Sequence, residues 1–431
     1  MLRPESSRPF SSVCLVIVLL TASVAFSADR QPVPVPQFQI EKYKVPNGLE
    51  VILAEDHRLP LVAVNLWYHV GPANEREGRT GFAHLFEHMM FEGSQHTGPK
   101  SHNRFLEAAG ASDINGSTDF DRTNYYETLP SNQLELALWL ESDRMGYLLG
   151  MLDRERLTNQ RDVVRNERRQ TTENAPYGLV EEELFHQLFP KDHPYHADVI
   201  GSHEDIEAAR LNDVREFFRQ YYTPNNCTMV IVGDIDPAKA KALVEKYFAS
   251  IPSGPPVPPL TAQPPVITAE KRSVVTDQVE LPKVYMGWIS PTAFQPGDAE
   301  ANLLAELLGG GKSSRLYKKL VYEKQIAQDV SVTNQSLRLG SVFEIQATAR
   351  PGIKTEDLEK AIDNELSNIR AEGPARAELD RARNLIQTRR IASIEGYGGR
   401  ADWFNLYNQY LHDPNFLAQD LKRQLGTTGR K

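Results

Sequence analysis

The chain of 431 residues is 40% hydrophobic and 24% charged, fractions that are typical of a globular protein and that exclude an intrinsically disordered chain. Its net charge of −9 argues against a nucleic-acid binder, because such proteins are usually basic. The two cysteines, Cys14 and Cys227, exclude a cysteine-based zinc site, and loss of Cys14 with a leader would also exclude an internal disulfide.

Residues 1–27 have the pattern of a secretory signal peptide. A positively charged start precedes a largely apolar run, Val13–Phe26, which is short for a membrane span. The small residues Ala25 and Ser27 predict cleavage before Ala28. We therefore expect an exported protein, periplasmic or secreted, with no membrane span in its mature chain. The alternative is an uncleaved N-terminal anchor.

The next part of the chain alternates between strand and helix patterns. Apolar runs and period-two alternation predict strands, whereas a period near 3.6 predicts helices. In chain order we expect strands at 49–54 and 61–70, a helix at 80–91, a strand at 124–129, a helix capped by Ser131, helical structure in 155–170, a helix at 212–221, a strand at 228–232 and a helix at 237–248.

Residues 251–266 are rich in proline, which fixes φ and lacks a backbone N–H. This segment predicts an extended linker between two domains, 34–250 and 267–431. In the second domain we expect a strand at 283–289, a helix at 299–308, a strand at 341–348 and a helix capped by Thr355. The order strand, helix, strand, helix recurs, which favours a duplicated domain over coincidence.

The segment TGFAHLFEHMMFEGS contains His84, Glu87 and His88 at positions that share one face of a helix. Two neutral imidazoles one turn apart can bind Zn²⁺, and a neighbouring carboxylate can take a proton from water. The pattern can also arise by chance. However, two histidines and a glutamate on an otherwise apolar helix are hard to bury without a metal.

A catalytic zinc site requires a third protein ligand, and the segment 155–170 offers one. Val163, Val164 and Glu167 can share an inward face of a helix there. Alternatively, Glu167 belongs to a solvated run of charges. The competing carboxylates are Glu173, Glu181 and Glu182.

Four stretches resemble the pitrilysin/insulinase family of HxxEH zinc metallopeptidases: HLFEHMMFEGS, NGSTDFDRTNYYETLP, QRDVVRNERRQTTENAPYG and HPYHADVIGS. The similarity is greatest to its two-domain branch, which includes bacterial zinc proteases and the mitochondrial processing peptidase. The resemblance implies that His84, His88 and Glu167 bind one Zn²⁺ per chain and that Glu87 is the general base.

The same resemblance implies how substrate binds. In this family the peptide adds a strand to a sheet edge, and the matching residues here are Asn115, Gly116 and Ser117. The alternative is a plain strand start or a loop. We expect an α+β fold of two homologous domains, each a mostly antiparallel sheet covered by helices. The first would be the catalytic domain, and the second an inactive peptidase-like copy truncated at its C-terminus.

Three positions depart from the family pattern. Gln160 stands where many relatives have a glutamate, seven residues before the third ligand. In LVYEKQIAQDV, Tyr322 and Gln328 stand where the family often has an arginine and a tyrosine that reach the substrate. We therefore expect a dimer, preferably a heterodimer with a metal-free homologue that supplies these groups, or otherwise a homodimer.

These observations predict an exported zinc metalloendopeptidase that hydrolyses peptide bonds in peptides or unfolded protein segments. The first alternative is a non-catalytic peptidase-like scaffold or assembly subunit, against which the intact motif and Glu167 argue. A zinc-dependent hydrolase of non-peptide substrates is a second alternative, because the same ligands support other hydrolyses.

Overall fold

The computed structural model describes residues 35–427, so the predicted signal peptide lies outside the described residues. From Pro36 onward these residues form one compact unit. No helix in this described part is long and apolar enough to cross a membrane.

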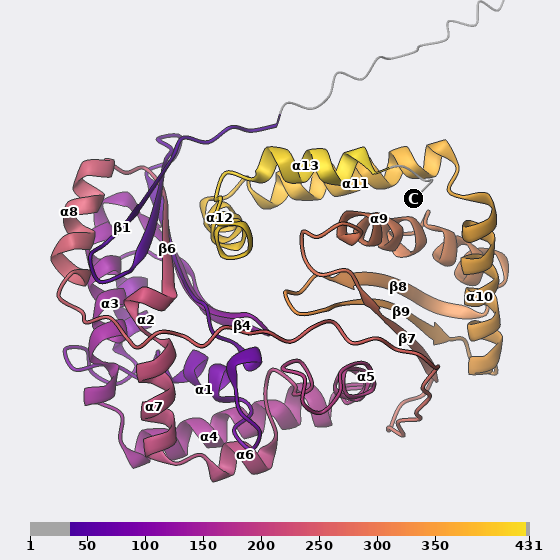
Figure 1. Ribbon diagram of the computed structural model, residues 1–431, viewed down its shortest axis with the longest axis horizontal. Coiled ribbons are helices and arrows are strands. Elements are labelled where there is room, and N and C mark those ends of the chain that lie inside the picture. Colours follow the sequence, from indigo (N-terminus) through magenta and orange to yellow (C-terminus); the bar gives the residue numbers. More distant parts are fainter. Residues whose placement is uncertain (1–34, 428–431) are drawn as a thin grey trace, which may run out of the picture. The chain divides into compact units, whose positions relative to one another are not determined.

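The first sheet has six strands in the order β1-β2-β6-β3-β5-β4. Its strands are β1 (Ile40–Lys44), β2 (Glu50–Glu55), β3 (Leu61–Tyr68), β4 (Ser112–Asp119), β5 (Arg122–Pro130) and β6 (Cys227–Gly233). Figure 1 labels three of them, β1, β6 and β4. β2 and β6 run parallel, and all other neighbours are antiparallel. β4 forms one edge of the sheet, and this edge borders the candidate site described below.

One face of the first sheet packs against helices from the same half of the chain. These helices are α1 (Phe82–Met89), α2 (Ser101–Ala108), α3 (Leu134–Tyr147), α4 (Arg154–Arg168), α6 (His203–Ala208), α7 (Leu211–Tyr221) and α8 (Pro237–Phe248). The remaining helix of this half, α5 (Val180–Leu188), packs against strands of the second half. Phe86 of α1, Leu138 of α3 and Val244 of α8 join Leu66 of β3 in one buried apolar core. This core fixes the position of α1 against the sheet.

The second sheet is antiparallel, with three strands in the order β7-β9-β8. Its elements are β7 (Lys283–Ser290), α9 (Asp298–Gly309), β8 (Ala327–Gln335), β9 (Ser341–Ala349), α10 (Thr355–Glu372), α11 (Arg376–Ser393), α12 (Tyr397–Leu411) and α13 (Leu417–Gly426). Helices α9 and α10 bury Leu308 and Ile362 against Ile345 of β9. Between Phe248 and Lys283 the described chain contains no helix or strand.

Each half of the chain contributes one helix that packs on the sheet of the other half. Helix α12 buries Ala401 and Phe404 against Ala63 and Val230, on the face of the first sheet opposite α3 and α8 (Figure 1). Helix α5 packs Leu188 beside Val342 of β9 in a separate apolar cluster. Because apolar burial stabilises both contacts, the two halves are held together by reciprocal packing.

The structure confirms the predicted α+β class, and most predicted elements occur within a few residues of their expected bounds. Both predicted helix caps are wrong. The hydroxyl of Ser131 donates to Asp234, and Ser131 is the first residue of a 3₁₀ turn that precedes α3. Helix α10 includes Thr355 as its first residue, and Lys354 occupies the cap position. The predicted inward face of α4 also needs correction, because Val163 is 43% exposed.

Candidate metal centre

Helix α1 begins where the backbone at Gly81 lies close to the backbone at Ile200. Gly81 has a φ of 82°, and a Cβ atom on it would lie 2.6 Å from the carbonyl oxygen of Ile200, so only glycine fits there. The half-buried carboxylate of Glu75 accepts backbone N–H bonds of 2.8 Å from Gly81 and from Ala83. These contacts pair backbone donors that the start of a helix otherwise leaves unsatisfied.

The apolar side chains of α1 determine where its polar side chains point. Phe82, Leu85, Phe86 and Met89 are buried in the core of the first sheet. Since residues three and four apart share a helix face, the two histidines are directed together toward α4. The sequence correctly predicted this largely buried helix.

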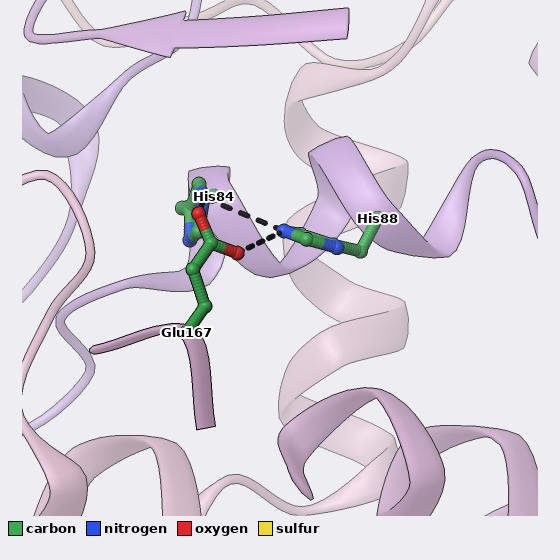
Figure 2. Close-up of side chains that lie close together, drawn as sticks. All are labelled: His84, His88 and Glu167. Atoms are coloured by element: carbon green, nitrogen blue, oxygen red, sulfur yellow. Dashed lines mark hydrogen bonds and ion pairs between the residues drawn. The ribbon is translucent and has the colours of Figure 1, made fainter. Parts of the chain in front are cut away.

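Three ligand atoms converge between α1 and α4 (Figure 2). The Nε2 atoms of His84 and His88 lie 3.4 Å apart. His88 Nε2 lies 3.0 Å from Glu167 Oε2, and His84 Nε2 lies 3.6 Å from Glu167 Oε1. One ligand atom from each of the three residues falls within 4.8 Å of the others.

This donor set suits a divalent cation. Two imidazole nitrogens and one carboxylate are the protein ligands of many catalytic zinc sites. The two Nε2 atoms face each other at close range, and a cation between them and the carboxylate would satisfy all three lone pairs. The residues present therefore fit one Zn²⁺.

The electrostatics around this cluster favour negative charge on Glu167. Hydrogen bonds from His84 and His88 hold the pKa of the Glu167 carboxyl well below its usual range. Burial disfavours a charged His84, but its hydrogen bond to Glu167 and the nearby Glu87 carboxylate together raise its pKa. The cluster thus concentrates negative potential where a cation would bind.

The three carboxylates that competed with Glu167 as the third ligand have other partners or lie at other positions. Glu173 lies 2.8 Å from His203, and Glu182 accepts a 2.7 Å hydrogen bond from Arg168. Glu181 lines the neighbouring cavity. Among the described residues, only Glu167 joins the two histidines in a group that could hold a metal. Gln160, the first departure from the family pattern, is buried on the same helix.

Glu87 lies beside this cluster and contacts the sheet edge. Its Oε2 accepts a 2.7 Å hydrogen bond from the hydroxyl of Thr118 on β4. A Cβ atom added to Gly116 on the same strand would lie 3.2 Å from Glu87 Cγ. The edge strand and the motif helix are therefore packed directly on each other.

A cavity of about 440 Å³ opens over these groups. Glu87, Ser117, Thr118 and Glu167 line it from the first half of the chain, and Tyr285 and Gln346 line it from the second sheet. Of the other two predicted strand residues on β4, Gly116 lies next to Glu87, whereas Asn115 lines a different cavity.

Tyr322 and Gln328, the two departures from the family pattern in the second half, lie away from this cavity. Tyr322 is 54% exposed, and Gln328 is exposed as well. Neither lines the cavity. Sequence reasoning missed Tyr285 and Gln346, which pair across β7 and β9 and face the first half of the chain. The alternation of the two strands predicts that these residues share a face of the sheet. It does not predict that this face meets the first half of the chain.

Comparison with known proteins agrees with this architecture. The family described as insulinase (peptidase family M16) matches residues 50–201, and the peptidase M16 inactive domain matches residues 208–386. The zinc protease PqqE of Helicobacter pylori is 30% identical over 375 residues, covering 86% of this chain and 83% of that protein. A probable mitochondrial-processing peptidase subunit beta of Arabidopsis thaliana is 22% identical, covering 90% of this chain and 70% of that protein.

Solved structures show the same fold. The crystal structure of a protease from Helicobacter pylori superposes with a TM-score of 0.86 at 29% identity, over 91% of this chain and 94% of that one. The first half of the periplasmic protease PqqL from Escherichia coli gives a TM-score of 0.72 at 18% identity, over 91% and 86% of the two chains. The chain belongs to the insulinase (M16) family of peptidases, as its sequence motifs predicted.

Proposed function

We propose that this chain is a zinc-dependent endopeptidase that hydrolyses peptide bonds in peptides or unfolded protein segments. The observation that carries the proposal is the convergence of His84, His88 and Glu167 beside a carboxylate, Glu87, that is anchored to a sheet edge. The three converging residues would hold one Zn²⁺. When bound, the ion would polarise the scissile carbonyl and lower the pKa of an attacking water.

The protein's own groups would move the proton. Glu87 accepts a proton from the attacking water and passes it to the leaving amine, as a general base and then a general acid. The hydrogen bond from Thr118 holds the Glu87 carboxylate in one orientation while it does so. Tyr285, which lines the cavity, can offer a phenolic hydroxyl to the oxyanion that develops on the carbonyl.

We place the substrate along β4, whose outer side lacks a neighbouring strand in the first sheet. An extended peptide gains backbone hydrogen bonds by adding a strand at such an edge. Asn115, Gly116 and Ser117 would form that contact, next to Glu87. Folded proteins cannot present an extended strand readily, so peptides and unfolded segments are the expected substrates.

We further propose the domain boundaries 34–250 and 267–431 and export through the leader of residues 1–27. N-terminal sequencing of protein from the native host should find Ala28 or Asp29 first. An intact Met1 in a cytoplasmic fraction would contradict export.

We also propose that the active form is a dimer, preferably with a metal-free homologue that carries the missing arginine and tyrosine. Homodimerisation is the second option. At the two positions where the family often has the arginine and the tyrosine, this chain has Tyr322 and Gln328, and both are exposed. The chain alone should then bind zinc but cleave peptides slowly, and adding the partner should restore turnover. Full activity from a monomer would contradict this proposal and would mean that Tyr285 or another group of this chain suffices as the donor.

A peptide-library digestion tests the main proposal. The zinc-loaded wild type should cleave internal peptide bonds, and a chelator should abolish cleavage until zinc is restored. Purified protein that binds no zinc and cleaves no peptide would instead support the scaffold alternative.

A further inference from the structure

A second cavity lies on the opposite face of the same edge strand. It has a volume of about 480 Å³ and is lined by residues of β3, β4, β5 and α12. Its polar lining includes Asn65, Asp113, Arg122, Tyr126 and Asp402. Ser117 of β4 borders this cavity and also the cavity at the candidate metal centre.

The alternation of β4 separates the two cavities. Thr118 bonds to Glu87 on the metal side, whereas the hydroxyl of Ser117 donates a 2.7 Å hydrogen bond to Asn124, which lines the second cavity. A peptide added to this edge alternates in the same way, because successive side chains of a strand point to opposite faces. If one side chain faces the metal centre, its sequence neighbours face the second cavity.

The second cavity contains a carboxylate oxygen with free bonding capacity. Asp402 Oδ1 accepts hydrogen bonds of 3.2 Å from Trp67 and 3.4 Å from Asn65. Within residues 35–427, no hydrogen bond reaches Asp402 Oδ2. Burial raises the pKa of the Asp402 carboxyl, although the nearby Arg122 opposes this shift. A cation placed here would relieve the cost of burying that charge.

Among the described residues, the guanidinium of Arg122 bonds to groups other than Asp402. Its Nη1 donates bonds of 2.8 Å to the carbonyl and 2.6 Å to the hydroxyl of Ser117, and its Nε lies 3.4 Å from Asp119. The cavity is lined by two carboxylates, Asp402 and Asp113, and by one cation, Arg122, which is also paired with Asp119. Its lining is therefore net negative.

We propose that the second cavity is a specificity subsite that takes a lysine or arginine side chain of the substrate, at a position next to a residue that faces the metal centre. The ammonium or guanidinium group would donate to Asp402 Oδ2, and Asp113 would add a charge at the mouth. This inference rests on the proposed peptidase function, because it places the substrate on β4.

Binding to the full chain carrying Glu87→Gln tests the subsite without cleavage. The probes are short fluorescein-labelled peptides of alanine and valine in which one arginine, or one citrulline in its place, is scanned through the positions. At one or two positions the arginine peptide should bind at least about tenfold more tightly than its citrulline match, the gain expected from one charged hydrogen bond.

Adding Asp402→Asn should reduce that ratio to near one, because the amide oxygen can still accept from Trp67 and Asn65 while the charge is lost. Asp363→Asn, an exposed substitution on α10, is the matched control and should leave the ratio unchanged. Asp113→Asn should lower the ratio partly, and it is a safe second variant because asparagine tolerates the φ of 54° found there. Circular dichroism checks the folding of each variant.

Equal binding of arginine and citrulline peptides at every position would overturn the proposal, as would a preference that survives in both Asp402→Asn and Asp113→Asn. A different result would contradict the peptidase function alone: the arginine preference is present and sensitive to Asp402→Asn, yet the zinc-loaded wild type cleaves none of the peptides.

Discussion

The hydroxyl of Thr118 donates a 2.7 Å hydrogen bond to Oε2 of Glu87, which joins the edge strand of the first sheet to the helix that carries the metal-binding motif. A peptide added to β4 would therefore be aligned relative to the proposed general base. The contact couples substrate position to proton transfer.

Replacing Thr118 with valine removes this hydrogen bond and keeps the shape of the side chain. We expect kcat to fall about tenfold, since a hydrogen bond to a charged group contributes roughly 1.5 kcal/mol or more. Zinc content should not change, because Thr118 contacts no ligand of the proposed ion. Thr118→Ser is the control and should retain most activity. A variant with valine that matches the wild type in kcat would show that Glu87 needs no such anchor.

Zinc should stabilise the folded chain through its three ligands. At a free concentration a hundredfold above the dissociation constant, binding adds about 2.7 kcal/mol to the free energy of unfolding. Thermal melts with and without zinc measure this effect. The shift should disappear in His88→Ala and shrink strongly in Glu167→Gln, and it should survive in Glu173→Gln. A full shift in Glu167→Gln would remove that residue from the ligand set.

The sequence predicted the motif helix and its burial correctly, because three residues at helical spacing and an apolar remainder determine both. From spacing alone, Glu167 was one of several candidate carboxylates, since the choice depends on how α4 packs on α1, and only the family resemblance singled it out. Tyr285 and Gln346 were missed for the same reason: their strand face meets the first half of the chain only after folding. The exchange of α12 and α5 between the sheets is likewise a long-range contact that no local pattern encodes.

Because α12 packs on the first sheet, we predict that a residue from the last third of the chain stabilises that sheet. Phe404, only 1% exposed, packs there with Ala401 and Val230. Phe404→Ala should lower the free energy of unfolding by about 3–5 kcal/mol, as truncation of a buried aromatic side chain leaves a cavity. Phe105→Ala is the matched control, because Phe105 is 36% exposed. Urea unfolding that shows equal losses for both variants would contradict the packing of α12.

A buried carboxyl in the first sheet predicts a dependence of stability on pH. Burial and the neighbouring Glu141 raise the pKa of Glu127 well above its usual range, and neither carboxyl oxygen has a hydrogen-bond partner among the described residues. The folded state therefore keeps a proton that the unfolded state loses above its ordinary pKa of 4.5.

The stabilisation from this proton is complete below pH 4.5 and is lost as the pH rises toward the folded-state pKa. Glu127→Gln mimics the protonated side chain and has no such loss. Relative to the wild type, the variant should gain up to about 1.4 kcal/mol of stability per pH unit above that point. Urea unfolding at a series of pH values measures the difference, and a difference that does not change with pH would mean that Glu127 is ionised in the folded protein.

The most direct test of the proposed chemistry is a paired measurement of zinc content and turnover in Glu87→Gln. If Glu87 is the base and His84, His88 and Glu167 hold the ion, the variant should keep one zinc per chain while kcat falls by about 10²–10⁴-fold. A metal-free Glu87→Gln protein, or one that keeps wild-type turnover with zinc bound, would contradict the account.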